Sequence, residues 1–141
     1  MLAGSKIVLG ITGGIAAYKA AGLTRLLVKQ GAAVQVIMTV HAREFITPLT
    51  LQTLSGHPVY GDMFADWQED GIAHISLADY ADILVVAPAT ANVIGKIAGG
   101  LADDLLVANS ISSTTWSVNL AVGSAVGGLV AVAFGRNTVF V

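Results

Sequence analysis

A hydroxyl, an amide and an imidazole flank one short apolar segment of the chain. Residues 83–87 are continuously apolar and rich in β-branched side chains, which is typical of a strand buried on both faces of a parallel sheet. Pro88 ends this strand, and Thr90 and Asn92 follow directly. Since open α/β sheets bind ligands outside the carboxyl ends of their strands, these side chains predict a ligand site. The alternative is that Thr90 only caps a helix over residues 91–98.

His74 precedes the same strand and is the candidate group for proton transfer near neutral pH. A lone histidine in this place is also a common structural residue, so both interpretations remain open. Asp103 and Asp104 follow Gly99-Gly100, which indicates a helix start whose dipole favours acidic residues rather than an acid/base dyad. The sequence contains no cysteine, which excludes disulfides, thiolate metal sites and a cysteine nucleophile, and we predict no metal site.

The turn Gly13-Gly14 is a second candidate site, between an apolar strand over residues 6–11 and a helix over residues 15–30. Its spacing matches neither the G-x-G-x-x-G pattern of dinucleotide sites nor the Walker loop with its lysine. The backbone N–H groups of Gly13, Gly14 and Ile15 predict an anion cradle at a helix start. The alternative is a tight connection without a ligand.

The second predicted strand, over residues 34–38, supports a phosphate rather than a dinucleotide. A dinucleotide site would place Asp or Glu near the end of this strand to bind the ribose hydroxyls, but Met38 and Thr39 stand there. The hydroxyl of Thr39 suits a phosphate instead. His41 and His57, further along the chain, are expected to face solvent.

Two helices of the first half are predicted from their end signals. The helix over residues 15–30 ends before Gly31, and a second helix begins at Thr47-Pro48 and ends before Gly56. Their expected apolar positions are Leu23, Leu26, Leu27, Leu49, Leu51 and Leu54. The first half therefore reads as a β-α-β unit followed by a further helix.

The composition restricts the class of partner. Charged residues make up only 11% of the 141 residues and hydrophobic residues 55%, whereas soluble domains average roughly 25% charged residues. Much of the surface must therefore be covered, by copies of the chain, by a partner domain or by a membrane. A net charge of -2 with scattered basic residues excludes nucleic acid as a partner. No secretory signal is evident, so we expect a cytoplasmic protein.

Three stretches of the chain together form a specific pattern. They are KIVLGITGGIAAYK from Lys6, FITPLTLQTLSGHPV from Phe45 and IAHISLADYADILVVAPATANVIGKIAGGLADDLL from Ile72. In these stretches the chain resembles the homo-oligomeric FMN-dependent cysteine decarboxylases, and most closely the phosphopantothenoylcysteine decarboxylases of coenzyme A biosynthesis. The resemblance implies an α/β fold, a flavodoxin-like or Rossmann-like three-layer sandwich with a parallel sheet. It also implies a homotrimer with FMN at the interface between chains.

The resemblance also assigns roles to particular residues. The phosphate of FMN would be held by Gly13, Gly14, Ile15 and Thr39, and the flavin side by Ala89, Thr90, Ala91 and Asn92. His74 would be the catalytic residue, acting as a base or orienting the substrate thiol. The flavin would oxidise that thiol to a thioaldehyde, so that the carboxylate lies β to an electron sink and carbon dioxide leaves.

The resemblance ends near residue 110, which divides the chain into an FMN-binding flavoprotein domain, 1–110, and an atypical apolar tail, 111–141. The tail lacks the Pro-x-Met-Asn segment and the cysteine that the family uses to bind the substrate carboxylate and protonate the product. Three interpretations of the tail remain open: substitute strands over 129–134 and 138–141, a membrane-seeking segment over 118–134, or non-native sequence from a frameshift or fusion. We favour the third interpretation and least favour the membrane.

The expected activity is FMN-dependent decarboxylation of the cysteine moiety of phosphopantothenoylcysteine, impaired in this form. One alternative is a non-catalytic flavoprotein, a regulatory subunit that lends His74 to a mixed trimer. Another is oxidative decarboxylation of a peptide with a C-terminal cysteine, which uses the same fold without the reducing cysteine.

Overall fold

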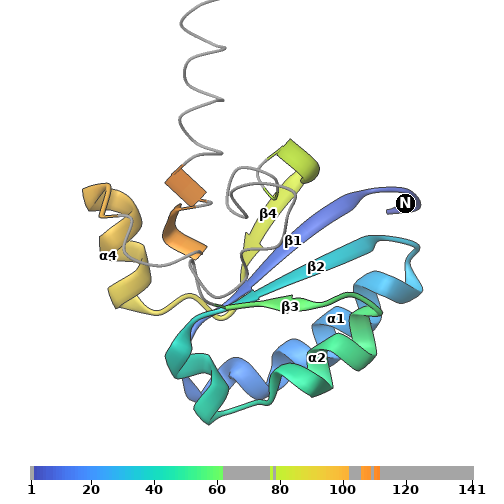
Figure 1. The fold of residues 1–141 in the computed structure, drawn as a ribbon, viewed down its shortest axis with the longest axis horizontal. Helices are drawn as coiled ribbons and strands as arrows, with labels where there is room; N and C mark the ends of the chain where they lie inside the picture. Colours follow the sequence, from blue (N-terminus) through green and yellow to red (C-terminus); the bar gives the residue numbers. More distant parts are fainter. Residues whose placement is uncertain (1, 62–76, 78, 102–105, 109, 112–141) are drawn as a thin grey trace, which may run out of the picture.

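A computed structural model describes residues 2–61, 77, 79–101, 106–108, 110 and 111. Figure 1 shows its elements along the chain. They are the strands β1 (Lys6–Ile11), β2 (Ala33–Met38), β3 (Val59–Tyr60) and β4 (Ile83–Val86), the α-helices α1 (Ala20–Lys29), α2 (Pro48–Ser55) and α4 (Ala91–Gly99), and the 3-10 segments η1 (Ile15–Lys19) and η2 (Val40–Glu44).

The four strands form one parallel sheet in the order β3-β2-β1-β4. In this register Leu9 of β1 lies between Val36 of β2 and Val85 of β4. The chain moves outward from β1 to β3 and then crosses to the other side of β1 to form β4 (Figure 1). This is the order of a Rossmann-type sheet, and its topological switch point lies between β1 and β4.

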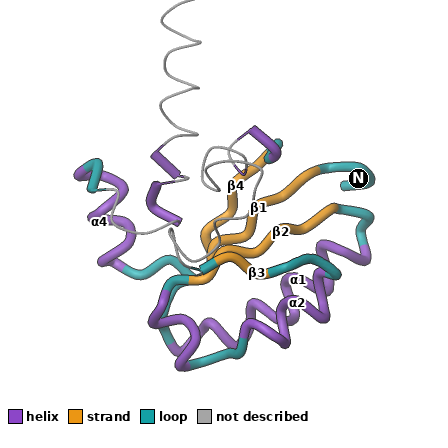
Figure 2. Tube along the Cα trace, viewed as in Figure 1, coloured by secondary structure: helices purple, strands orange, loops and turns teal. Residues whose placement is uncertain are grey.

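Helices cover both faces of the sheet. Successive side chains of β1 point to opposite faces, so they belong to two separate apolar cores. Ile7, Leu9 and Ile11 pack toward α1 and α2, whereas Val8 packs in a second cluster with Val93 of α4 and the helical residues beyond it. Figure 2 shows α1 and α2 on one side of the strands and α4 on the other. The predicted three-layer α/β sandwich with a parallel sheet is confirmed.

The predicted helix ends are confirmed where local hydrogen bonds and glycines define them. Thr47 caps α2, since its hydroxyl accepts a hydrogen bond from the N–H of Thr50 at 3.4 Å, and Pro48 occupies the first turn. Gly56 and Gly31 follow their helices with φ angles of +74° and +87°. Left-handed backbone of this kind favours glycine because a Cβ atom would be strained there.

Two expectations about these helices were wrong. The first helix does not run unbroken from Ile15, because η1 forms a 3-10 turn before α1 begins at Ala20. Leu26 is also not a core residue: it is 61% exposed, since Ala20 and Thr24 make the buried stripe of α1 and Leu26 falls beside it. Leu49 is likewise exposed on α2, where Leu51 faces the core.

The expectation that residues 83–87 are buried on both faces was also wrong. β4 is an edge strand of the described sheet and pairs only with β1. Ile83 is 49% exposed, and Leu84, Val85 and Val86 are half-buried. A run of apolar residues predicts a strand that becomes buried. It does not indicate whether residues of the same chain or another molecule bury it.

Several predictions lie outside the described residues. His74, the pair Asp103 and Asp104, and the tail beyond residue 111 belong to these segments, so the predicted boundary at residue 110 stays a prediction. Within the part of the chain that the structure describes, no helix combines the length and the apolar character needed to cross a membrane.

Candidate functional site

The carboxyl ends of β1, β2 and β4 meet around one cavity of about 330 Å³. It lies beside the switch point, where doubly wound sheets bind their ligands. Its lining consists of Gly13, which follows β1, Thr39, Val40 and His41, which follow β2, and Thr90, Asn92, Val93 and Lys96, which follow β4. Ligand pockets range from roughly 300 to 1,000 Å³, so the described residues enclose space for part of a nucleotide-sized molecule.

Gly13 is held in close contact with the backbone of η2. A Cβ atom on Gly13 would overlap the Cβ atom of His41 and lie 2.9 Å from the carbonyl oxygen of His41. A side chain therefore cannot be added here without moving η2. At Gly14 the nearest atom to such a Cβ is Cγ2 of Thr90 at 3.8 Å, which is ordinary contact. Only the first of the two glycines is required by close packing.

The predicted anion cradle keeps two of its three expected donors. The N–H of Gly14 donates to the carbonyl oxygen of Thr12 at 3.1 Å and is therefore occupied. The N–H groups of Gly13 and Ile15 have no acceptor within the described part of the chain. Because η1 is only a five-residue 3-10 turn, the cradle depends on these individual N–H groups rather than on a long helix dipole.

Thr12 joins the end of β1 to the turn that opens α4. Its side chain is fully buried, and its hydroxyl donates to the carbonyl oxygen of Pro88 at 2.7 Å and accepts from the N–H of Thr90 at 3.0 Å. The peptide bond between Ala87 and Pro88 in this turn is cis. Thr12 was not among the predicted site residues, although a hydroxyl directly after a buried strand was a usable signal.

Thr90 fulfils both of the interpretations that its sequence position left open. Its hydroxyl accepts a hydrogen bond from the N–H of Val93 at 3.4 Å, which caps α4. The same side chain lines the cavity, together with Asn92 in the first turn of α4. Capping and contact with a ligand are therefore compatible at Thr90.

The structure brings some of the predicted site residues together and leaves others beside the cavity. Those in the lining are Gly13, Thr39, Thr90 and Asn92. Those adjacent in sequence but outside the lining are Gly14, Ile15, Ala89 and Ala91. Ile15 is 77% exposed, and its side chain therefore stands at the molecular surface. His74 belongs to a segment outside the described residues.

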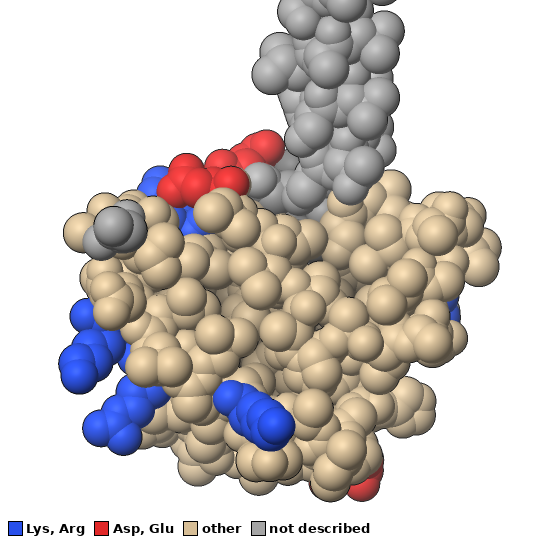
Figure 3. Space-filling model, turned by 180° about the vertical axis from the view of Figure 1, so that it is seen from behind, with Lys and Arg blue, Asp and Glu red and all other residues tan. Residues whose placement is uncertain are grey.

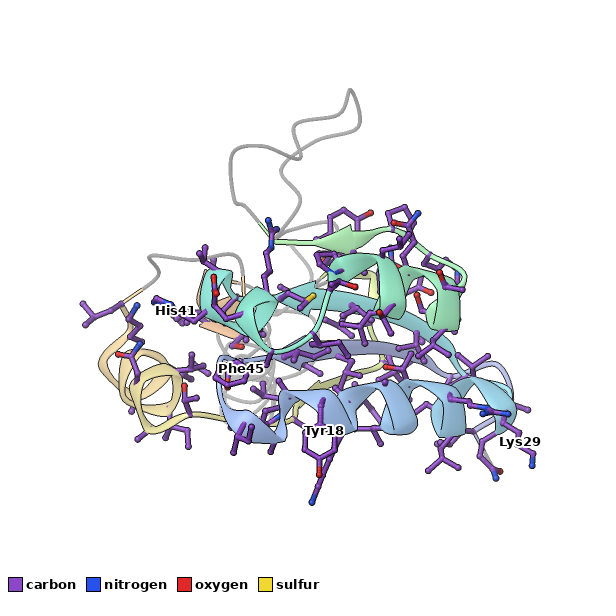
Figure 4. All side chains as sticks on the ribbon, turned by 90° about the horizontal axis from the view of Figure 1, so that it is seen from below. Tyr18, Lys29, His41 and Phe45 are labelled. Carbon is purple, nitrogen blue, oxygen red and sulfur yellow. The ribbon has the colours of Figure 1, made fainter. Side chains whose placement is uncertain are left out.

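Sequence reasoning missed two basic residues of the lining, His41 and Lys96. His41 is exposed, as expected, but it also faces the cavity, and Figure 4 shows its side chain between η2 and α4. Lys96 could have been found from its spacing, because residues four apart on a helix share a face and Asn92 was already a candidate. His57 is half-buried rather than solvent-facing, with Nδ1 at 3.0 Å from the carbonyl oxygen of Ser55.

The charge of the lining favours an anion. Among the described residues it contains the basic side chains His41 and Lys96 and no carboxylate. The first turn of α4 adds the partial positive charge of a helix N-terminus. The fold and the site thus define a doubly wound α/β protein with a cavity at its switch point, and the basic residues of the described lining favour an anionic ligand there.

Comparison with known proteins gives the family. The model of the family described as Flavoprotein matches residues 1–118, and the chain belongs to this family. A curated relative, the coenzyme A biosynthesis bifunctional protein CoaBC of Vibrio cholerae, is 56% identical over 105 residues, which cover 74% of this chain and 26% of the relative. The chain thus spans about a quarter of the length of the curated relatives it matches.

Solved structures agree with the fold. The FMN-dependent cysteine decarboxylase SpaF matches with a TM-score of 0.74 and 32% identity, over 80% of this chain and 65% of SpaF. A PPC decarboxylase mutant complexed with pantothenoylaminoethenethiol matches with a TM-score of 0.67 and 33% identity, over 76% of this chain and 59% of that chain.

Proposed function

We propose that this chain forms the FMN-binding part of a phosphopantothenoylcysteine decarboxylase, a carboxy-lyase of coenzyme A biosynthesis that works in the cytoplasm. The observation that carries the proposal is the switch-point cavity, which joins Gly13, Thr39 and Thr90 in a member of the Flavoprotein family. The identity with CoaBC and the likeness to a PPC decarboxylase complex support this substrate class.

The described residues fit a ligand that carries a phosphate. Gly13 lets η2 pack closely against the turn because it has no Cβ atom, and the N–H groups of Gly13 and Ile15 have no acceptor among the described residues, so they are available as donors. Thr39 adds a hydroxyl from the end of β2. These residues would bind the phosphate of FMN, and the segment from Ala89 to Asn92 would contact the flavin side.

Each protein group has a limited task in the proposed reaction. Bound FMN would supply the two-electron oxidation of the substrate's cysteinyl thiol, which makes loss of carbon dioxide possible. We assign His74 the role of the acid/base residue that removes or orients the thiol proton. Gly14 shapes the turn, because its own N–H is bonded to Thr12.

The surface around the cavity supports a homotrimer in which a second copy completes the site. Val40 lines the cavity, and Ile15 and Ile94 lie close in sequence to lining residues. The exposed fractions of Ile15, Val40 and Ile94 are 77%, 67% and 55%. Figure 3 shows a face of the molecule whose broad central area carries no charged side chain. Exposed apolar side chains of this kind mark surfaces that become covered. A second copy seated there would enclose the part of FMN that the small cavity leaves outside.

A second candidate function is oxidative decarboxylation of a peptide with a C-terminal cysteine. The likeness to SpaF, an FMN-dependent cysteine decarboxylase, agrees with decarboxylation of a cysteine in this second candidate as well as in the first. A mixed trimer, in which this chain is a non-catalytic flavoprotein subunit, is the remaining alternative from the sequence. The first two differ in the substrate that loses carbon dioxide, and the mixed trimer differs from both because activity would need a second kind of chain.

The test supplies the FMN-loaded chain with phosphopantothenoylcysteine in one sample and with a cysteine-terminated peptide in another, and detects the product by mass spectrometry. We expect decarboxylation of phosphopantothenoylcysteine in a version whose residues 111–141 are replaced by the corresponding CoaBC segment. In this version His74→Asn should lower the rate about 10²–10⁴-fold while FMN stays bound, because asparagine cannot exchange a proton near neutral pH. If only the peptide is decarboxylated, the first function is wrong and the second is supported. If His74→Asn retains a near-parental rate, His74 has no catalytic role.

A further inference from the structure

His41 lines the cavity, and its ring has no partner among the residues that the structure describes. His41 is exposed and lines the cavity, and no hydrogen bond or ion pair of its ring occurs among the described residues. The segment that carries it, η2, begins directly after Thr39, whose backbone N–H donates to the carbonyl oxygen of Ile11 at 3.0 Å. The ring therefore stands on a backbone that is fixed to the end of β1.

The position of His41 is tied to the glycine of the cradle. Its Cβ atom and carbonyl group occupy the space that a side chain on Gly13 would need. The side chain of His41 therefore begins beside the backbone of Gly13, whose N–H has no acceptor among the described residues. Gly13 and His41 both line the cavity, and rotation about χ1 and χ2 changes where in it the ring nitrogen atoms lie.

The surrounding charge selects the kind of acceptor. Lys96 contributes a second basic side chain from α4 to the same lining, and no carboxylate occurs in the part of that lining which the structure describes. Figure 4 shows His41 on the side of η2 that faces α4. A group bound among the Gly13 N–H, the His41 ring and the first turn of α4 is surrounded by donors, which suits a doubly charged phosphate monoester.

We propose that His41 is a specificity-determining residue of this site, and that its ring donates a hydrogen bond to the phosphate monoester of the bound flavin and so favours FMN over riboflavin. The inference rests on the proposed function, since it takes the flavin as the ligand. It adds a side-chain donor to the backbone N–H groups and the Thr39 hydroxyl that the sequence pattern predicts.

The test compares His41→Ala with the unchanged chain by fluorescence titration of FMN and, separately, of riboflavin. Alanine retains the Cβ atom that packs against Gly13, so the variant should fold. We expect the dissociation constant for FMN to rise about tenfold or more, as for loss of a charge-assisted hydrogen bond, and that for riboflavin to stay unchanged. His41→Gln, which keeps an N–H donor, should recover a large part of the FMN affinity.

His57→Ala is the matched control, because His57 precedes β3 at the opposite edge of the sheet and bonds to Ser55. It should change neither affinity. Equal loss of FMN and riboflavin affinity in His41→Ala would mean that the ring contacts the shared part of the flavin and would overturn the proposal. An unchanged FMN affinity would overturn it as well.

A second measurement separates this inference from the proposed function. Inorganic phosphate is titrated into the ¹⁵N-labelled chain, and the amide resonance of Gly13 is followed by NMR. We expect a saturable shift that needs more phosphate in His41→Ala. If neither flavin binds but His41→Ala still needs more phosphate than the unchanged chain to shift the Gly13 resonance, the proposed function fails. The contact of His41 with an anion then stands. If the intact chain binds no flavin and phosphate leaves Gly13 unmoved, both fail.

Discussion

Thr12 and Thr90 are joined by a hydrogen bond across 78 positions of the chain: the N–H of Thr90 donates to the hydroxyl of Thr12 at 3.0 Å. The same hydroxyl donates to the carbonyl oxygen of Pro88 at 2.7 Å. One buried side chain thus holds the turn before α4 against the end of β1. This contact sets the spacing between the glycine turn and the capped helix, which are two of the three walls of the cavity.

Replacing Thr12 by valine should destabilise the protein and weaken flavin binding. Valine is similar in shape but leaves the N–H of Thr90 and the carbonyl oxygen of Pro88 with fewer partners in a buried region. We expect a loss of about 1–3 kcal/mol in the free energy of unfolding, measured by urea denaturation. Thr12→Ser keeps the hydroxyl and should lose less. Equal stability of Thr12→Val and the parent would show that this bond does not fix the turn.

The two helix caps offer a matched comparison of structural and binding roles. Thr90→Ala and Thr47→Ala each remove a hydroxyl that accepts an N–H of the first turn. Each should cost about 0.5–2 kcal/mol of stability. Only Thr90→Ala should also raise the dissociation constant for FMN, because Thr47 lies outside the cavity lining. FMN titration of both variants checks this. If Thr90→Ala and Thr47→Ala bind FMN equally well, Thr90 only caps α4 and does not contact the ligand.

Gly13→Ala should disrupt the cavity, whereas Gly22→Ala should not. The new Cβ atom at Gly13 meets the backbone of His41, which must move, so a loss of about 1–3 kcal/mol is expected. A Cβ atom at Gly22 in α1 meets no atom within 4 Å, and alanine should stabilise the helix by about 0.5–1 kcal/mol. Thermal unfolding of the pair measures both effects. A Gly13→Ala variant with parental stability and FMN affinity would contradict the close packing.

Light scattering tests the assembly. The FMN-loaded protein should have the mass of a multiple of three chains of 14.4 kDa. Ile94→Asp should break the assembly, because it places a charge among the exposed apolar side chains beside the cavity. Leu26→Asp, at a similarly exposed site on α1, should leave the assembly intact. A monodisperse monomer that retains FMN would rule out a site shared between copies.

Features that depend on a few neighbouring residues could be predicted from the sequence. Thr47 and Thr90 cap their helices through N–H groups three residues away, and Gly31 and Gly56 follow helices where the backbone is left-handed. The parallel sheet followed from apolar runs that alternate with helical segments. All of these signals are local, so the sequence carries them directly.

Features that depend on how distant segments meet could not be predicted in the same way. His41 was expected only to face solvent, since nothing near it in sequence indicates that η2 packs against Gly13. The half-exposure of β4 depends on which segment lies beside it, which an apolar run cannot specify. The hydrogen bond from the N–H of Gly14 to the carbonyl oxygen of Thr12 depends on the turn geometry, which the sequence does not specify.

The central claim is that this chain binds FMN at the switch-point cavity, and a flavin titration of the intact chain tests it most directly. FMN fluorescence and absorbance are followed as protein is added, and circular dichroism of the same sample verifies the fold. The account predicts saturable binding of one FMN per chain, with weaker binding of riboflavin and loss of affinity in Gly13→Ala. A folded protein that takes up no FMN would contradict it.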